Sequence, residues 1–223
     1  MSVVATLLFR EREPEYKGKS MSEWMEIYES SFQPDGPGDL SARREAVDAV
    51  RHMRDQVLPL ALNLISHEKP AWKDSVEHFM EFKLDVRRWC PTWVWWPFYR
   101  YPPNEGSIYF EMLGPDAGPA VPELVRIINE SESFNISVRA IDALALIGTA
   151  GLPPLAQIIA DPTNPHRRYA VCTVGVMMDR HPDTAKTAIP LLVNCLNDPA
   201  PDVRFAATNA LNEFGPGVPT SVQ

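Results

Sequence analysis

Apolar residues recur along the chain in an eight-residue pattern that appears four times. Each copy opens with an aliphatic residue and a proline and continues as an apolar segment, at 58–65, 121–128, 152–159 and 189–196. Proline in the first turn of a helix loses no hydrogen bond, because the amides there have no acceptor within the helix. The pattern therefore predicts four helices that begin at Pro59, Pro122, Pro153 and Pro190.

A second apolar pattern accompanies the first, with a small residue, a larger one four positions later and another three positions further on. The small residues are Ala46, Gly106, Ala140, Ala170 and Ala207; Val50, Phe110, Leu144, Val174 and Leu211 follow, and then Met53, Leu113, Ile147, Met177 and Phe214. This spacing is one face of an α-helix. Gly114, Gly148 and Gly215 come next, where a helix end favours a residue that can adopt positive φ. The predicted unit is helix, short turn, helix and stop.

The distance from the proline of the first helix to the small residue of the second is 17 or 18 residues in three units. From Pro59 to Gly106 it is 47 residues, which predicts an insertion of about 30 residues at roughly 66–96. The fold class is then an all-α superhelix of about five helix pairs. We expect residues 1–38 to form an N-terminal segment with a capping helix, 39–215 the repeat array, and 216–223 a tail.

The last unit, residues 198–215, resembles the short bacterial form of the HEAT repeat, whose second helix reads D-x-x-V-R-x-x-A-x-x-A-L-x-x-I-G. In that family an aspartate and an arginine form a ladder between successive units. The resemblance places five residues in such a ladder: Arg43, Arg167 and Arg204, which share one position, and Asp161 and Asp198, each six residues before such an arginine. The unit that contains Ile136 departs from the pattern, because Ser137 occupies its arginine position.

Residues 16–25, followed by repeats and an aromatic insertion, are similar to a group of bacterial HEAT-repeat proteins that often carry an N-terminal membrane segment. Ser20 or Ser22, together with Glu23, is predicted to cap a helix that runs through Tyr28. The apolar stretch at residues 3–9 is too short to cross a bilayer. We expect a cytoplasmic protein as the sequence is written, and a membrane-anchored one only if the native chain begins upstream of Met1.

Composition narrows the possible functions. The 22 prolines among 223 residues are about twice the usual share, but 45% hydrophobic residues exclude a disordered chain. The net charge of −8 opposes non-specific binding to nucleic acid. Three cysteines without a C-x-x-C spacing, Cys90, Cys172 and Cys195, predict neither a disulfide framework nor a zinc site.

The Trp-rich insertion is the part of the chain least like a repeat, since it holds five of the six tryptophans. Tryptophan, tyrosine and arginine are common at the energetic centres of protein interfaces, and insertions in repeats often emerge on the binding face. The candidate binding residues are Trp93, Trp95, Trp96, Tyr99 and Arg100. In the alternative interpretation these aromatics form a small satellite core that holds the insertion against the repeats.

No catalytic residues, metal site or cofactor are predicted. HEAT-fold hydroxylases hold iron through repeated His-Glu pairs, and only His67-Glu68 has that order here. HEAT-like DNA glycosylases need a basic groove, to which Arg43, Arg44, Arg51 and Arg54 could contribute, but the overall acidity opposes it. Asp48, Asp142 and Asn209 share one position of the second helix and would form a polar strip if these helices line the concave side; the alternative, which we favour, is an ordinary solvated face.

The sequence therefore favours a non-enzymatic scaffold for protein–protein interaction, with a concave helical surface and an aromatic patch. Its expected partner is a protein or peptide rather than nucleic acid. The alternative is a HEAT-like enzyme or nucleic-acid binder, glycosylase-like or lyase-like, that uses the same groove.

Overall fold

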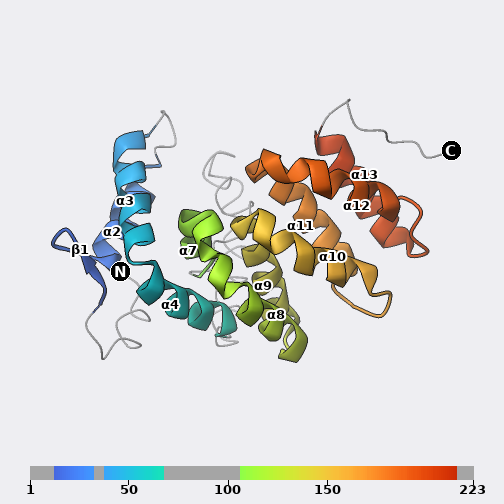
Figure 1. Ribbon diagram of the computed structural model, residues 1–223, viewed down its shortest axis with the longest axis horizontal. Coiled ribbons are helices and arrows are strands. Elements are labelled where there is room, and N and C mark those ends of the chain that lie inside the picture. The colour runs from blue at the N-terminus through green and yellow to red at the C-terminus, as the bar shows by residue number, and fades with distance from the viewer. Residues whose placement is uncertain (1–12, 33–37, 68–105, 215–223) are drawn as a thin grey trace, which may run out of the picture.

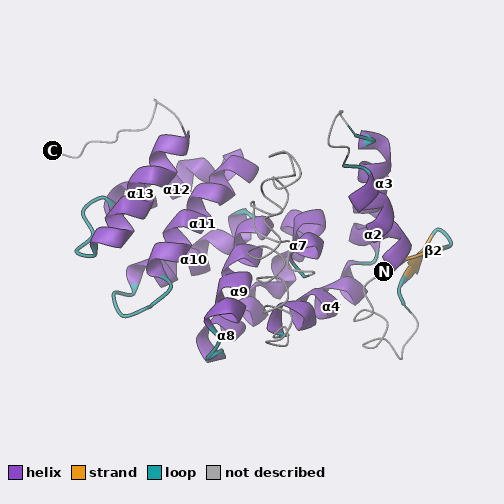
Figure 2. Ribbon diagram, turned by 180° about the vertical axis from the view of Figure 1, so that it is seen from behind, coloured by secondary structure: helices purple, strands orange, loops and turns teal. Residues whose placement is uncertain are grey.

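The computed structural model describes residues 13–32, 38–67 and 106–214. Nearly all regular structure in these ranges is helical (Figure 2). The exception is a hairpin of two short strands, β1 (Glu15–Tyr16) and β2 (Lys19–Ser20). It leads directly into α2 (Met21–Ser30), where Ser20 and Glu23 form the expected reciprocal cap.

The described helices follow one another as five pairs, which confirms the predicted all-α superhelix (Figure 1). The pairs are α2 with α3 (Leu40–His52), α4 (Arg54–Ser66) with α7 (Ser107–Leu113), α8 (Val121–Glu130) with α9 (Phe134–Ile147), α10 (Leu152–Ala160) with α11 (Arg167–Arg180), and α12 (Ala185–Cys195) with α13 (Pro201–Phe214). Short 3-10 segments at Gly114–Ala120, Thr149–Gly151 and Pro182–Thr184 lead into α8, α10 and α12. The helices α4 and α7 pack together although the predicted insertion lies between them in the sequence, outside the described residues.

The helices form two layers that differ in how closely they pack. The second helices α3, α7, α9, α11 and α13 contact one another in order, whereas the first helices α4, α8, α10 and α12 make few contacts among themselves. A Cβ atom on Gly175 in α11 would lie 2.8 Å from the Cβ of Ala210 in α13, so these two helices approach closely only because residue 175 is glycine. We call the closely packed second helices the inner layer and the first helices the outer layer.

The core lies between the two layers and contains the residues of the second apolar pattern. The small residues Ala46, Ala140, Ala170 and Ala207 are fully buried, as are the larger residues four positions after them. Gly114 and Gly148 end α7 and α9 with φ of 53° and 80°. These observations confirm the predicted helix face and two of the three predicted stops; Gly215 lies outside the described residues.

The proline pattern predicts the start of only two of the four first helices correctly. Pro122 and Pro153 are the second residues of α8 and α10, as expected. Pro59 and Pro190 lie inside α4 and α12, each of which begins five residues earlier, so the predicted starts are wrong there. The additional turns bury Val57 and Ala188, which offsets the hydrogen bond that an internal proline removes, while both proline rings remain exposed.

Candidate functional site

An exposed strip with apolar residues lies on the inner layer, over α11 and α13. We call it the inner strip; it consists of Arg168, Cys172, Val176, Phe205 and Asn209, which lie at helix positions opposite the buried small residues. Phe205 is 62% exposed and Val176 37% exposed, while Cys172 is half-buried. Large apolar side chains beside a cation and an amide are typical of a surface that is covered by a partner.

A polar cluster continues the inner layer toward α9 and α7. The hydroxyl of Tyr169 donates to the Asp142 carboxylate at 2.8 Å, and Arg180 forms an ion pair with Glu111 at 2.9 Å. Burial raises the pKa of Asp142 to about 6, against the smaller opposing effects of the Tyr169 hydrogen bond and the Arg180 charge. The predicted polar strip is thus uneven, since Asp142 is partly buried whereas Asp48 and Asn209 are exposed.

The predicted ladder residues make different kinds of contact. Arg167 forms an ion pair with Asp198 of the next helix pair, with the side chains only 11% and 10% exposed, and its Nε donates to the Ile159 carbonyl at 2.9 Å. Arg204 donates to the backbone carbonyl of Asp198 at 2.7 Å. Asp161 accepts hydrogen bonds from the amide and hydroxyl of Thr163 in its own loop.

Arg43 contacts an aromatic ring and a hydroxyl. Its guanidinium carbon lies 3.7 Å from the centre of the Phe32 ring, and its Nε donates to the Ser31 hydroxyl at 3.3 Å. Both partners follow α2, so Arg43 ties the first helix of the array to α3 through a cation–π contact.

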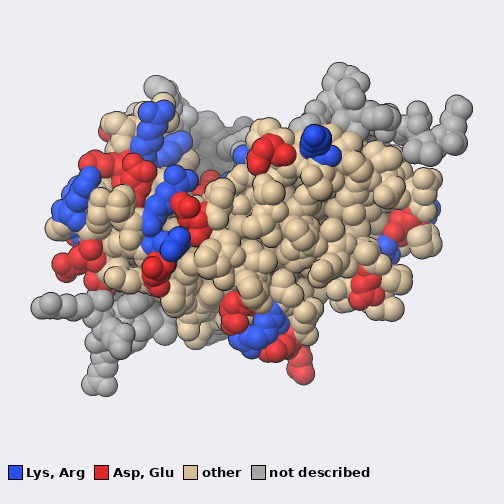
Figure 3. All heavy atoms as spheres, in the orientation of Figure 1, with Lys and Arg blue, Asp and Glu red and all other residues tan. Residues whose placement is uncertain are grey.

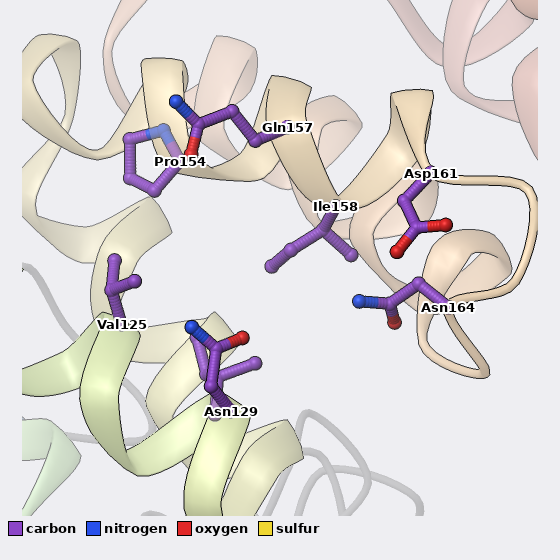
Figure 4. A pocket seen from close by; sticks show the side chains of 8 residues that line it. Val125, Asn129, Pro154, Gln157, Ile158, Asp161 and Asn164 are labelled. Carbon is purple, nitrogen blue, oxygen red and sulfur yellow. The ribbon is translucent and has the colours of Figure 1, made fainter.

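A hollow of about 160 Å³ opens on the outer layer between α8 and α10 (Figure 4). It is lined by Val125, Ile128, Asn129, Pro154, Gln157, Ile158, Asp161 and Asn164. Sites for whole small-molecule ligands usually exceed about 300 Å³. The hollow therefore has the size for a single functional group.

Neither described cysteine has the properties of a catalytic nucleophile. Burial raises the pKa of the Cys195 thiol to about 11 and shifts that of Cys172 in the same direction, so both stay protonated near neutral pH. Within the described ranges, no group of three histidine, cysteine or acidic side chains is arranged to hold a metal ion.

The predicted aromatic patch of Trp93, Trp95, Trp96, Tyr99 and Arg100 lies outside the described residues. Of the inner strip, only Asn209 belongs to a set that the sequence pattern indicates, the polar strip of the second helices. Phe205 carried a usable signal, because it lies two positions before the small residue of its helix and thus on the face away from the core. The hollow between α8 and α10 had no such signal, because it depends on how two helices pack.

Charged residues gather at the N-terminal end of the array, over α3 and α4, while much of the surface toward α13 on the same face lacks charge (Figure 3). The arginines there do not form a uniformly basic surface. Arg51 pairs with Asp116 at 3.4 Å and Arg54 with Asp55 at 2.9 Å. Both the local charges and the overall charge therefore argue against the basic groove that a glycosylase-like function requires.

Comparison with known families supports the helical arrangement. A sequence profile of HEAT repeats matches residues 152–223, which include α10 to α13. The search of curated proteins found no significant match. This part of the chain is thus similar to HEAT repeats, a type of domain that often serves as a scaffold for protein interactions. The described helices before it pack in sequential pairs in the same way. Among the described helices, none is long and apolar enough to cross a membrane.

Proposed function

We propose that this protein is a non-enzymatic scaffold that binds a protein or peptide across the inner strip. The observation that supports this most directly is the exposure of Phe205 and Val176 on the neighbouring helices α13 and α11, with Arg168 exposed on α11 two turns before Val176. Fully burying a phenylalanine side chain is worth about 1.5–3 kcal/mol, so covering the 62% of Phe205 that is exposed contributes up to about 2 kcal/mol. The Trp-rich insertion would add a second contact surface.

Site-specific cross-linking tests the proposed surface. A photoreactive residue placed at Val176 or Phe205 is expected to capture the same partner in cells of the source organism. The same residue at Thr187, which is exposed on the outer helix α12, serves as the control and should not capture it. Equal capture from Thr187 would contradict the proposal, because contact would then not be confined to the inner layer.

A substitution measures the contribution of the strip. Phe205→Ser is expected to weaken binding of the captured partner at least about ten-fold, with little change in thermal stability because the side chain is exposed. Conservative replacement of Trp93, Trp95 and Trp96 tests the insertion. Retained helicity with weaker partner binding supports a contact surface, and a collapse of thermal stability supports the satellite core.

A further inference from the structure

The contact made by Arg167 defines a place for a guanidinium group between two helix pairs. Arg167 lies three positions before the small residue of α11. Its side chain reaches the carbonyl of Ile159 at the end of α10 and the carboxylate of Asp198 in the next loop. These two acceptors lie six and eight positions after the prolines of their own first helices.

The same three positions one helix pair earlier hold Ser137, Ile128 and Asp161. A serine side chain is too short to reach across the junction as arginine does. Ile128 and Asp161 both line the hollow between α8 and α10. By the register of the repeat, the hollow lies where the guanidinium of the absent arginine would be.

Polar atoms without partners lie at this junction. Ser137 is fully buried, and within the described structure neither its Oγ nor the Nδ1 of His166 has a hydrogen-bond partner. The ring of Phe134, one turn before Ser137, lies 5.1 Å from that of His166, which places both atoms near the start of α9. Arg139 does not replace the missing arginine, since it donates to the carbonyl of His67 at 2.7 Å.

The surroundings of the hollow favour a cation. Ile128 and Asn129 belong to the last turn of α8, and Ile158 to the last turn of α10; neither helix has a basic residue in that turn. Helix C-termini carry partial negative charge and expose carbonyls without helical donors. Asp161 adds a carboxylate whose Oδ1 accepts both bonds from Thr163, so its Oδ2 has no protein donor among the described residues.

We propose that this hollow binds the guanidinium group of an arginine side chain from a partner protein, which completes between two chains the contact that Arg167 makes within one. Its volume of about 160 Å³ suits the end of one side chain. The planar guanidinium group can donate hydrogen bonds to a carboxylate and to a helix carbonyl at the same time. An ammonium group acts as a point charge and lacks this fixed geometry. The site is on the outer layer and does not depend on the function proposed for the inner strip.

A titration of the whole chain with N-acetyl-arginine amide, followed by NMR, tests the site. The side-chain amides of Asn129, Gln157 and Asn164 line the hollow and should shift saturably, with a dissociation constant of roughly 1 mM. N-acetyl-citrulline amide has nearly the same shape without the charge, and we expect it to bind at least about ten-fold more weakly. Equal binding of both probes, or shifts that do not saturate, would overturn the proposal.

Two variants and one control variant locate the bound group. Ser137→Arg should fill the hollow from within, abolish the shifts and raise the melting temperature by about 2–4 °C. Asp161→Asn should weaken binding of the arginine probe at least about ten-fold. Glu132→Gln, which removes an exposed carboxylate in the loop after α8, should leave this binding unchanged. Probe binding that persists in Ser137→Arg overturns the proposal; if that variant does not fold, undiminished binding by Asp161→Asn does.

Discussion

Gly175 sets the distance between α11 and α13. These two helices pack more extensively than the other neighbouring second helices, and a Cβ at residue 175 would lie 2.8 Å from the Ala210 Cβ and 3.3 Å from its Cα. Real Cβ atoms do not approach that closely, so a side chain here would push the helices apart. The inner strip lies across the same two helices, which makes its geometry depend on this glycine.

We therefore predict that Gly175→Val lowers the free energy of unfolding by about 1–3 kcal/mol, the usual cost of overpacking a core. Chemical denaturation followed by circular dichroism measures this loss. Gly118→Ala is the matched control, because the nearest atom to its new Cβ is 4.0 Å away, and it should be neutral or slightly stabilising. Equal stability of both variants would show that the helices can separate without loss.

Asp142 illustrates how burial alters the acidity of a single residue. Its pKa is raised to about 6 in the folded chain from an ordinary value of 3.8. The folded state then holds this proton more tightly than the unfolded state does. Ionisation of Asp142 as the pH rises from about 4 to about 6 therefore lowers the stability of the fold.

Replacing Asp142 by Asn should remove this pH-dependent loss of stability, because asparagine does not ionise. The difference in free energy of unfolding between Asp142→Asn and the wild type is expected to grow in favour of the variant from pH 4 to pH 7, by about 1 kcal/mol or more. Urea denaturation at a series of pH values measures it. A difference that stays constant across this range would mean that Asp142 has an ordinary pKa.

At the scale of the helix, the four repeated prolines fall into two structural classes. Pro122 and Pro153 occupy the second position of α8 and α10, where no amide hydrogen bond is lost. Pro59 and Pro190 are the sixth residues of α4 and α12, where an amide would otherwise bond to the preceding turn. The same sequence pattern therefore has different energetic consequences.

Substitution by alanine should separate these classes. Pro190→Ala is expected to raise the free energy of unfolding by about 1 kcal/mol, since it restores a helical hydrogen bond at an exposed position. Pro153→Ala should be neutral or lower it by up to about 1 kcal/mol, because only the restriction of the unfolded chain is lost. Thermal unfolding of the pair tests this, and opposite signs would show that α12 in fact begins near residue 190.

Among the described residues, Arg167 and Asp198 form the most buried ion pair between two helix pairs. Removing one partner of a pair that is about nine-tenths buried leaves an uncompensated charge. Arg167→Ala should cost about 3 kcal/mol of stability. Arg126→Ala, which breaks exposed pairs with Glu123 and Glu130, should have little effect because water already screens these charges. Denaturation of both variants compares them; equal costs would contradict a special role for Arg167 between pairs.

At the scale of the whole molecule, charge distinguishes the proposed scaffold from a nucleic-acid binder. The chain carries 29 acidic against 21 basic residues, and Arg51 of α3 and Arg54 of α4 each pair with an aspartate. We predict no retention on duplex DNA even at about 50 mM salt, where phosphate contacts are strong. Chromatography on immobilised DNA measures this, and retention that falls steeply with salt would favour the alternative function.

The sequence by itself determined the helical repeat, its buried face and two of its glycine stops. These features depend on local periodicity and on the termination of single helices, which neighbouring residues specify. Only the tertiary structure decided that α12 begins before Pro190, that α11 and α13 approach closely at Gly175, and that a hollow lies beside Asp161. Each of these depends on how closely helices distant in sequence approach one another, and this distance is set by side chains that pack across the junctions between helices.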